Sequence, residues 1–341
     1  MTGFRSTEVL PPAIYQRLIE LRVSDPDRSL RAALRRNRRP KMAPLGKLNL
    51  VAADHPARGV VSIGADPIGM ADRRDFLARV LRVLSSDVVD GLMATMEVLE
   101  DLLVIHDLIL ERGGPAILDQ KLLIASLNRG GLAGSIWELD DPMTGASPQT
   151  CIDWRFDGAK VLLRLCLGDA GSLKTLIAAA EAITRMNAYS LPTFLEALPV
   201  VKTEKSFQIQ KSKEALASAV SIAAALGDSS RYLWLKLPYC DEYEVVARAT
   251  SLPILILGGE SKGDATPFLN QIAAAMAAGS NVRGAMVGRT VLYPGNRDPL
   301  AVAEAVGAIV HKGWPVTDAL AITSGSLTAG TPAAQAFTEG R

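Results

Sequence analysis

Short apolar runs alternate with longer helical patterns through most of this chain, and this alternation constrains the fold more than any other feature. Eight runs have the length and composition of buried strands: 48–53, 88–94, 121–127, 159–165, 191–198, 232–237, 252–257 and 284–288. They are continuously apolar, which is typical of strands that helices cover on both faces. Their starts lie about 20 to 41 residues apart, which leaves room for one crossover helix each.

The stretches between these runs carry helical periodicity. Phe76, Val80 and Leu84 recur every four residues, as do Leu77 and Leu81. Helix-forming, Ala-rich stretches follow at 170–186, 211–226, 265–278 and 299–311. Eight β-α units in a row predict an α/β protein with a closed (β/α)8 TIM barrel. A doubly wound open sheet is the alternative, but its nucleotide-binding form would carry a GxGxxG fingerprint where this chain has DHPARG.

Three parts are expected along the chain: an N-terminal helical extension over 1–45, the barrel over 46–322 and a flexible tail over 323–341. The barrel contains a long insertion after its third strand, at 128–158, and loops of this length are often functional.

The extension predicts two helices. Pro12 opens the first, and Ser24 is the expected N-cap of the second. Seven basic residues lie between Arg28 and Lys41. A nucleic-acid patch is one interpretation. A solvated helix end is favoured, because positive charge suits a helix C-terminus and no aromatic residue interleaves the arginines.

Composition excludes several classes of protein. The 37 basic and 36 acidic residues give a net charge of +1, so neither nucleic acid nor a membrane surface is an expected partner. Three cysteines cannot form a disulfide framework in 341 residues, and no apolar run reaches the roughly 18 residues that span a membrane. The start, MTGFRSTEVL, lacks a signal-peptide core. We therefore expect a soluble cytoplasmic protein. We also expect a homo-oligomer, because the helical exteriors of such barrels often form dimers or larger rings.

The active site of such a barrel lies at the C-terminal ends of its strands, and Lys236 is the sharpest candidate there. It lies in LWLKLPY, where burial would lower its pKa towards neutrality. A neutral amine attacks a carbonyl to form a Schiff base. The alternative is a structural lysine paired with a carboxylate of a neighbouring strand.

Three more ionisable residues lie in or beside the apolar runs. Lys160 would lower the pKa of a second buried lysine or bind an anionic substrate group, unless it lies at the base of its strand. Glu196 would move protons next to Lys236, or pair with Lys160 without proton transfer. Asp54 would act on the substrate hydroxyl, or would serve only as a turn residue.

Glycines and an arginine at the last two strand ends predict a phosphate cradle. Gly258 and Gly259 follow the seventh strand, and Gly288 and Arg289 follow the eighth. Barrels often bind phosphate there, because glycine lets backbone N–H groups approach an anion and arginine adds a fork of donors. Ordinary tight turns are the alternative interpretation.

Two other polar groups lie at strand ends: Arg164 is expected to contact the substrate, and His55 to orient the substrate or to serve a structural role. The other two histidines, His106 and His311, are far from His55 in sequence and show no ligand spacing. With no cysteine cluster either, no zinc site and no cofactor are expected.

Five segments together give the chain a family resemblance: VAADHPARG (51–59), FDGAKVLL (156–163), LPTFLEAL (191–198), LWLKLPY (233–239), and LGGE with VGRTVLY (257–260 and 287–293). In this order they resemble the class I, Schiff-base aldolases of the deoxyribose-phosphate, archaeal-type fructose-bisphosphate and tagatose-bisphosphate aldolase group. The resemblance covers residues 46–315. Arg164 and Leu165 stand where the tagatose branch tends to have tyrosines, which leaves the substrate more open than the reaction.

The resemblance implies a lyase acting on a phosphorylated sugar without a metal. Lys236 would form the imine, Glu196 and Lys160 would assist proton transfer, and Asp54 would act on the hydroxyl. Ala- and Arg-rich relatives occur near inositol catabolism, which makes 6-phospho-5-dehydro-2-deoxygluconate a candidate substrate. A phosphosugar isomerase on the same barrel and a non-catalytic phosphosugar-binding protein remain the alternatives.

Overall fold

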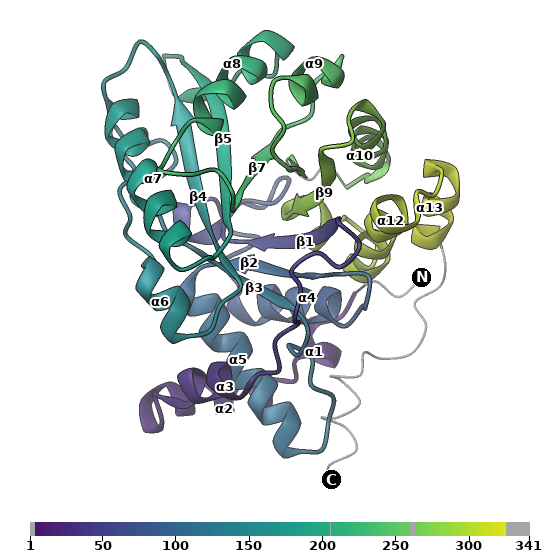
Figure 1. Ribbon diagram of the computed structural model, residues 1–341. Helices are drawn as coiled ribbons and strands as arrows, with labels where there is room; N and C mark the ends of the chain where they lie inside the picture. Colours follow the sequence, from purple (N-terminus) through teal and green to yellow (C-terminus); the bar gives the residue numbers. More distant parts are fainter. Residues whose placement is uncertain (1–3, 205, 260–262, 325–341) are drawn as a thin grey trace.

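Eight parallel strands form a closed barrel at the centre of the computed structural model, which describes residues 4–204, 206–259 and 263–324 (Figure 1). The strands are β1 (Leu48–Ala53), β2 (Gly91–Ala94), β3 (Leu122–Ser126), β4 (Gly158–Leu165), β5 (Thr193–Lys202), β7 (Leu233–Leu237), β8 (Ile254–Leu257) and β9 (Val282–Val287). The sheet order is β4-β3-β2-β1-β9-β8-β7-β5, and the pairing of β4 with β5 closes it. All eight predicted strands and the closed barrel are confirmed.

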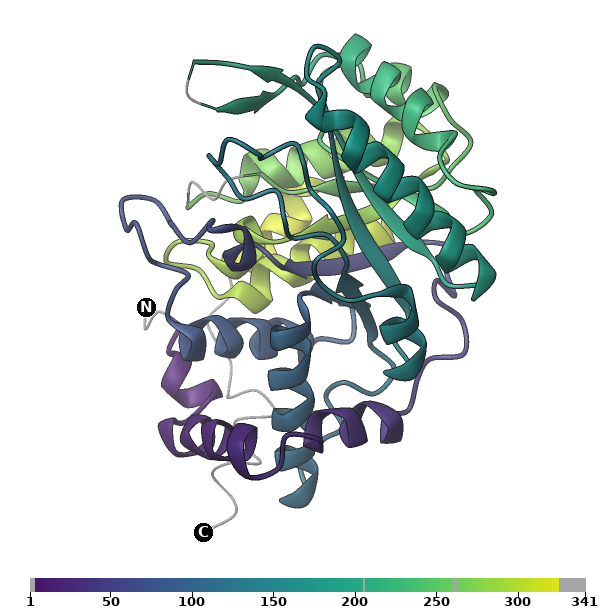
Figure 2. The ribbon, with the colours of Figure 1, turned by 90° about the vertical axis from the view of Figure 1, so that its left-hand side faces the viewer.

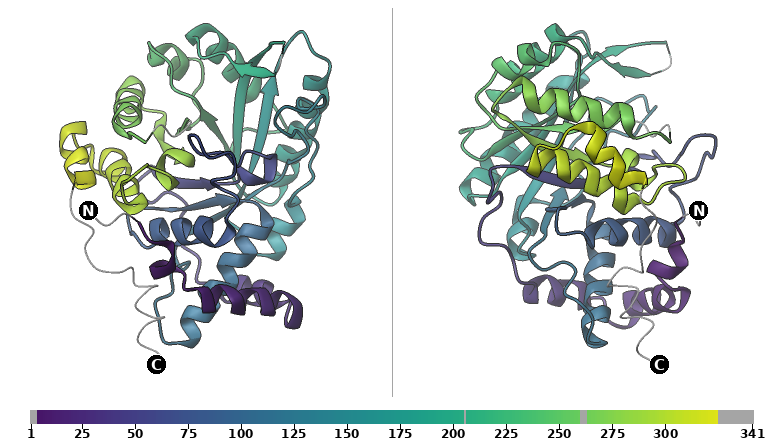
Figure 3. Two further views of the ribbon diagram at one scale, coloured as in Figure 1. Left: turned by 180° about the vertical axis from the view of Figure 1, so that it is seen from behind. Right: turned by 90° about the vertical axis from the view of Figure 1, so that its right-hand side faces the viewer.

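Helices surround the barrel, as the periodic stretches predicted. They are α4 (Arg73–Leu84), α5 (Met96–Glu111), α6 (Pro148–Asp153), α7 (Gly171–Ala188), α8 (Lys213–Ala224), α9 (Tyr243–Arg248), α10 (Thr266–Ala278), α11 (Arg289–Leu292), α12 (Pro299–Lys312) and α13 (Val316–Ser324), with a 3-10 turn at Pro56–Arg58. Figure 3 shows α10, α12 and α13 side by side outside β9 and β1. Within the described residues, no helix is long and apolar enough to cross a bilayer.

The interior of the barrel below the strand ends is apolar. Its buried side chains come from alternate strand positions: Leu48, Leu50, Ala52, Met93, Leu122, Ile124, Phe194, Leu255 and Met286. Strands β1 and β9 approach so closely that a Cβ on Gly284 would lie 1.9 Å from the carbonyl oxygen of Leu48, and the φ of Gly284 is +128°. Only glycine is tolerated at such a position. This packed base makes the barrel a core, so chemistry is confined to its mouth.

The N-terminal extension consists of α1 (Ser6–Val9), α2 (Pro12–Ser24) and α3 (Arg28–Arg35), which pack against α4 and α5 below the barrel in Figure 2. The first helix predicted at Pro12 is confirmed. The predicted N-cap at Ser24 is wrong, because Ser24 is the last residue of α2 and its hydroxyl donates to the carbonyl of Glu20 at 3.0 Å. Asp27 precedes α3 instead.

The basic run of the extension is not a solvated helix end, contrary to the interpretation favoured from the sequence. Arg36 is buried, and its Nη2 lies 2.8 Å from Oδ2 of Asp157, just before β4. Arg38 contacts the other oxygen of Asp157 at 2.8 Å, and Arg39 lies 3.0 Å from Asp90, just before β2. The arginines therefore fasten the extension to the base of the barrel. Their aspartates are remote in sequence, which is why the run resembled a free basic patch.

Two further features lie beyond the predicted pattern. Strand β5 continues four residues past its predicted end and turns back as an antiparallel partner, β6 (Phe207–Ile209). Figure 2 shows this hairpin projecting from the barrel. The expected tail begins inside α13, which extends to Ser324, and the rest of it lies outside the described residues.

Candidate active site

Three strands present the ionisable side chains of the candidate site to the barrel interior. Lys160 of β4 is the register partner of Phe194 on β5, and Glu196 of β5 and Lys236 of β7 lie two residues beyond Phe194 and Trp234, which belong to or pack against the apolar interior. Because side chains alternate along a strand, they share the face of the interior apolar residues. Glu196 and Lys236 are direct partners in the register of β5 and β7. The parallel strands thus bring together residues 36 to 76 positions apart, counted from 160 to 196 and from 160 to 236.

A chain of alternating charges joins five side chains at the mouth. Nζ of Lys236 lies 3.0 Å from Oε2 of Glu196, and Nζ of Lys160 lies 2.7 Å from the same oxygen. Lys160 also contacts Oδ2 of Asp54 at 3.2 Å. Arg129 donates to that Oδ2 at 2.9 Å and to the carbonyl oxygen of Asp54. The four residues predicted to be catalytic are therefore in one network.

Burial and charge oppose each other in this network. Burial would raise the pKa of Glu196, but the ammonium groups of Lys160 and Lys236 outweigh it and lower that pKa to about 2. Likewise, Lys160 and Arg129 outweigh burial and hold the pKa of Asp54 well below its ordinary value. Burial lowers the pKa of Lys160 despite both carboxylates. The site thus holds two ionised carboxylates among three cationic groups, an arrangement suited to proton transfer and to an anionic ligand.

His55 lies beside Asp54, with Nδ1 3.9 Å from Oδ1. Burial is the main cause that lowers the pKa of His55 to about 4. The carboxylate of Asp54 raises this pKa and the guanidinium of Arg289 lowers it, and the imidazole is therefore neutral at physiological pH. A Cβ on Gly288 would lie 2.3 Å from Cε1 of His55, so glycine is required for this approach. Gly288 and Arg289, predicted as phosphate ligands, therefore lie next to His55.

The two glycine-containing loops expected to bind phosphate are adjacent. The hydroxyl of Thr290, beside Arg289, donates to the carbonyl of Gly259 at 3.3 Å. A Cβ on Gly258 would lie 2.6 Å from Cγ1 of Val287, so a larger residue would clash there. A Cβ on Gly259 would have no atom within 4 Å. Residues 260–262 lie outside the described residues. Phosphate binding here stays a prediction.

Arg164 lies further along β4 and contacts the insertion. It donates to the carbonyl oxygens of Gly131 and Glu138 at 3.3 and 3.0 Å, and lies 3.4 Å from the carboxylate of Glu138. Across the same segment, Arg58 donates to Asp141 at 2.5 Å. These contacts hold the base of the insertion on the barrel. The structure therefore gives Arg164 partners in the protein and does not place it in the charge network.

Sequence reasoning assigned no role to Arg129, which lies three residues past the end of β3. Asn128, beside it, is fully buried and bonds to both the N–H and the C=O of Leu162 on β4, at 2.8 and 2.6 Å. The position of Arg129 near a strand end was the one sequence signal that could have identified it. That signal is the same for Asn128, whose side chain bonds to the backbone of β4, and for Arg129, whose side chain bonds to Asp54.

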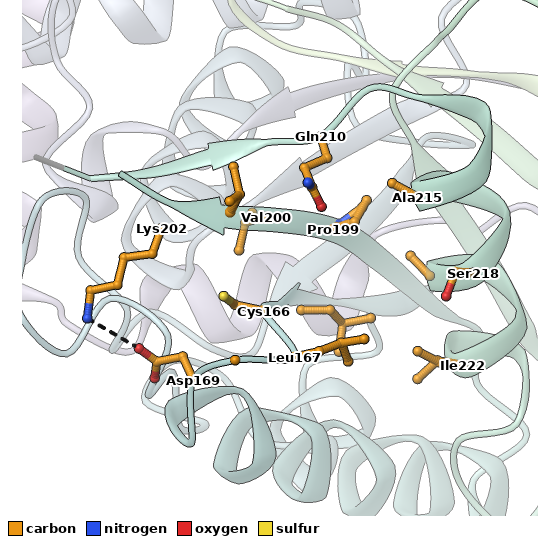
Figure 4. A pocket seen from close by; sticks show the side chains of 14 residues that line it. Cys166, Leu167, Asp169, Pro199, Val200, Lys202, Gln210, Ala215, Ser218 and Ile222 are labelled. Carbon is orange, nitrogen blue, oxygen red and sulfur yellow. Dashed lines mark ion pairs between the residues drawn. The ribbon is translucent and has the colours of Figure 1, made fainter. Parts of the chain in front are cut away.

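A hollow of about 470 Å³ lies elsewhere, between the loop after β4, the end of β5 and α8 (Figure 4). Leu167, Val200 and Ile222 line it, and Lys202 faces Asp169 at 3.7 Å on its rim. It contains none of the charged network. Within the described ranges, no three His, Cys, Asp or Glu side chains gather in a way that would hold a metal ion.

Comparisons with known proteins agree with this architecture. A family model described as Cgl0159-like matches residues 46–310. The crystal structure of Cgl0159 from Corynebacterium glutamicum (Brevibacterium flavum) is 35% identical, with 90% of this chain and 99% of that chain covered and a TM-score of 0.83. A comparison with curated proteins finds no match.

Two aldolase structures share the fold at lower identity. An archaeal fructose 1,6-bisphosphate aldolase is 21% identical, with 84% of this chain and 100% of that chain covered and a TM-score of 0.58. A Schiff-base-forming fructose-1,6-bisphosphate aldolase is 20% identical, with coverage of 83% and 99% and a TM-score of 0.58. The aldolase group that the sequence motifs resembled is thus confirmed as a group of structural neighbours.

Proposed function

The chain belongs to the Cgl0159-like family, and we propose that it is a class I aldolase that uses Lys236 to form a Schiff base. Its substrate would be a phosphorylated keto-sugar or keto-sugar acid. The observation that carries this proposal is the carboxylate of Glu196 between two buried lysines, 3.0 Å from Lys236 and 2.7 Å from Lys160. An isomerase needs a carboxylate base but has no use for a nucleophilic lysine beside it.

The proposed reaction uses the neutral amine of Lys236, and Glu196, 3.0 Å from its Nζ, relays the protons of the addition step. The neutral amine attacks the substrate ketone, and the carbinolamine loses its hydroxyl as water after Glu196 returns the proton. The resulting protonated imine withdraws electrons from the neighbouring carbon. Asp54 accepts the proton of the substrate hydroxyl, the carbon–carbon bond breaks, and an aldehyde leaves. The proton held by Asp54 is then delivered to the enamine carbon, and hydrolysis of the imine releases the second product and restores the lysine and the carboxylate.

Charge supports an anionic substrate. Lys160, Lys236 and Arg129 carry three positive charges against the two negative charges of Asp54 and Glu196, so the network has a net charge of +1. The glycine loops after β8 and β9 are the proposed phosphate cradle. As a specific substrate we propose 6-phospho-5-dehydro-2-deoxygluconate, whose cleavage would give a three-carbon phosphate and a three-carbon semialdehyde.

Borohydride trapping tests the proposal directly. The protein is incubated with this substrate, with phosphorylated ketoses and with dihydroxyacetone phosphate, then reduced, and adducts are mapped by peptide mass spectrometry. We expect an adduct on Lys236. Lys121 is a matched internal control, because it is also buried and burial lowers its pKa to about 8, yet its Nζ donates to two carbonyl oxygens at the barrel base.

The other outcomes are informative. An adduct on Lys160 would keep the chemistry and exchange the roles of the two lysines. An equal adduct on Lys121 would show that reactivity follows basicity rather than position in the site. Binding of a phosphosugar without any adduct would contradict the aldolase proposal and favour an isomerase or a binding protein.

A further inference from the structure

Arg129 is the one member of the charge network that neither the sequence motifs nor the proposed reaction explains. Its side chain is 8% exposed, so its guanidinium is held mainly by partners within the protein. It also lies at the start of the insertion, where its backbone N–H donates to the hydroxyl of Thr144 at 2.9 Å. A buried guanidinium is costly unless it is paired, so its partners indicate its role.

Those partners lie mainly on one residue. Nη1 of Arg129 donates to Oδ2 of Asp54 at 2.9 Å, while Nη2 donates to the carbonyl oxygen of the same residue. The hydroxyl of Ser126 accepts a further bond from Nη1 at 3.3 Å. Holding both the carboxylate and the backbone of Asp54 fixes its side-chain torsion at the end of β1. Such a two-point contact is characteristic of arginine and not available to lysine.

The second effect concerns Lys160, which shares Oδ2 of Asp54 with Arg129. Lys160 lies 3.2 Å from Asp54 but 2.7 Å from Glu196. Without the guanidinium, Lys160 would be the nearest cation to Asp54, and its ammonium would be drawn from Glu196 towards that carboxylate. The groups facing Asp54 are thus Arg129 from the loop after β3, Lys160 from β4, Lys236 from β7 and its own neighbour His55.

We propose that Arg129 is a positioning residue of the reaction, which holds Asp54 in place and leaves Lys160 available to Glu196. This inference rests on the proposed function, because it assigns Asp54 and Glu196 their parts in proton transfer. It also gives the insertion a role: a segment fastened by Arg58, Asp141 and Arg164 presents a guanidinium to the site.

The test compares Arg129→Gln and Arg129→Lys with the wild type by pH–rate profiles. In Arg129→Gln we expect kcat/KM to fall by about 10- to 100-fold. Its acid limb should move to higher pH, because losing a positive charge next to Asp54 raises the pKa of that carboxyl. Arg129→Lys should restore the position of the acid limb, but only part of the rate. The adduct on Lys236 should still form in both variants.

Arg82→Gln is the matched control, because Arg82 and Asp298 form an equally buried pair with side chains 9% and 7% exposed on the outer side of the barrel. It should reduce stability without moving the acid limb. An unchanged limb and rate in folded Arg129→Gln would overturn the proposal, as would an equal shift in Arg82→Gln.

A second measurement needs no turnover and separates this inference from the aldolase proposal. Carbon-13 NMR of aspartate-labelled protein, with the signal assigned by Asp54→Asn, follows the titration of Asp54 itself. We expect Asp54 to titrate at higher pH in Arg129→Gln than in the wild type. The same titration in both would sink the inference even if the aldolase is confirmed. Failure of the wild type to form an imine would sink the aldolase alone.

Discussion

The mouth and the base of the barrel both bury ion pairs, but their carboxylates are held differently. At the base, Asp157 accepts from two arginines and also from the backbone N–H of Leu123 at 2.9 Å. Asp90 accepts from Arg39, and from the backbone N–H of Asn49 at 2.7 Å.

At the mouth, Asp54 and Glu196 take their bonds from ammonium and guanidinium groups. A carboxylate bonded to backbone is part of the scaffold. One held only by side-chain cations can exchange a proton when a cation changes state. Buried charge alone therefore does not indicate a site, and at the two ends of the barrel the backbone bonds distinguish the scaffold carboxylates from those at the mouth.

The largest expected effect is at the mouth. Lys236→Met removes the proposed nucleophile, and Lys236→Arg keeps the charge without a nucleophilic amine. We expect both to lower kcat by about 10⁴-fold or more, measured with the substrate identified by trapping. Circular dichroism checks that both remain folded. Activity retained in Lys236→Arg would place the chemistry on another group.

A substitution at the base should affect stability instead. Arg36→Met leaves Asp157 with an incomplete set of partners, and breaking a buried pair typically costs about 3–5 kcal/mol. Urea denaturation should show this loss, while kcat per folded molecule stays near that of the wild type. If this variant does not fold, Arg38→Met, at a side chain that is 34% exposed, gives a milder version. A fall in kcat comparable to that of Lys236→Met would end the distinction between the two regions.

Glu196→Gln should reduce turnover while leaving the nucleophile in place. The amide retains the shape of the side chain but cannot accept the proton of Lys236. We expect kcat to fall by about 10²- to 10³-fold, as is typical when an acid–base group is removed. Single-turnover trapping should show a slower, but still complete, adduct on Lys236. A normal rate of adduct formation would show that Glu196 does not act in that step.

The dependence of stability on acid should reveal the same carboxylate. The pKa of Glu196 is about 2 in the folded protein against an ordinary 4.5, so the folded state binds this proton less readily than the unfolded chain. Its stabilising contribution is present above about pH 4.5 and is lost as the pH falls towards 2. Unfolding between pH 5 and 3 should therefore take up fewer protons in Glu196→Gln. An unchanged pH dependence of the free energy of unfolding would contradict the coupling.

The smallest effect is expected for an exposed pair on the extension. Arg17 and Glu20 lie 3.1 Å apart on α2 with side chains about half exposed. Arg17→Ala should change the free energy of unfolding by at most about 0.5 kcal/mol. Measured beside Arg36→Met, it separates the effect of burial from that of removing an arginine. A loss as large as that of Arg36→Met would mean that the extension depends on surface charge.

The sequence predicted the barrel because its signal is local. Each buried strand is a short apolar run and each helix a periodic one, so the eight strands and their covering helices can be located without knowing which strands are neighbours. The rule that active sites lie at strand ends then selected Asp54, Lys160, Glu196 and Lys236, which the structure brings together. The family motifs indicated the reaction more closely than the substrate, because β4 has Arg164 and Leu165 where the tagatose branch tends to have tyrosines.

Tertiary structure decided the partners. Nothing local links Arg129 to Asp54, 75 positions away, or Arg36 to Asp157, 121 positions away. Arginine was therefore left without a role in the first case and misjudged as solvated in the second. Apolar periodicity can be detected among residues close in sequence, because burial depends on which face of its helix or strand a side chain occupies. An ion pair depends on where two distant backbones meet, and only the closed barrel fixes that.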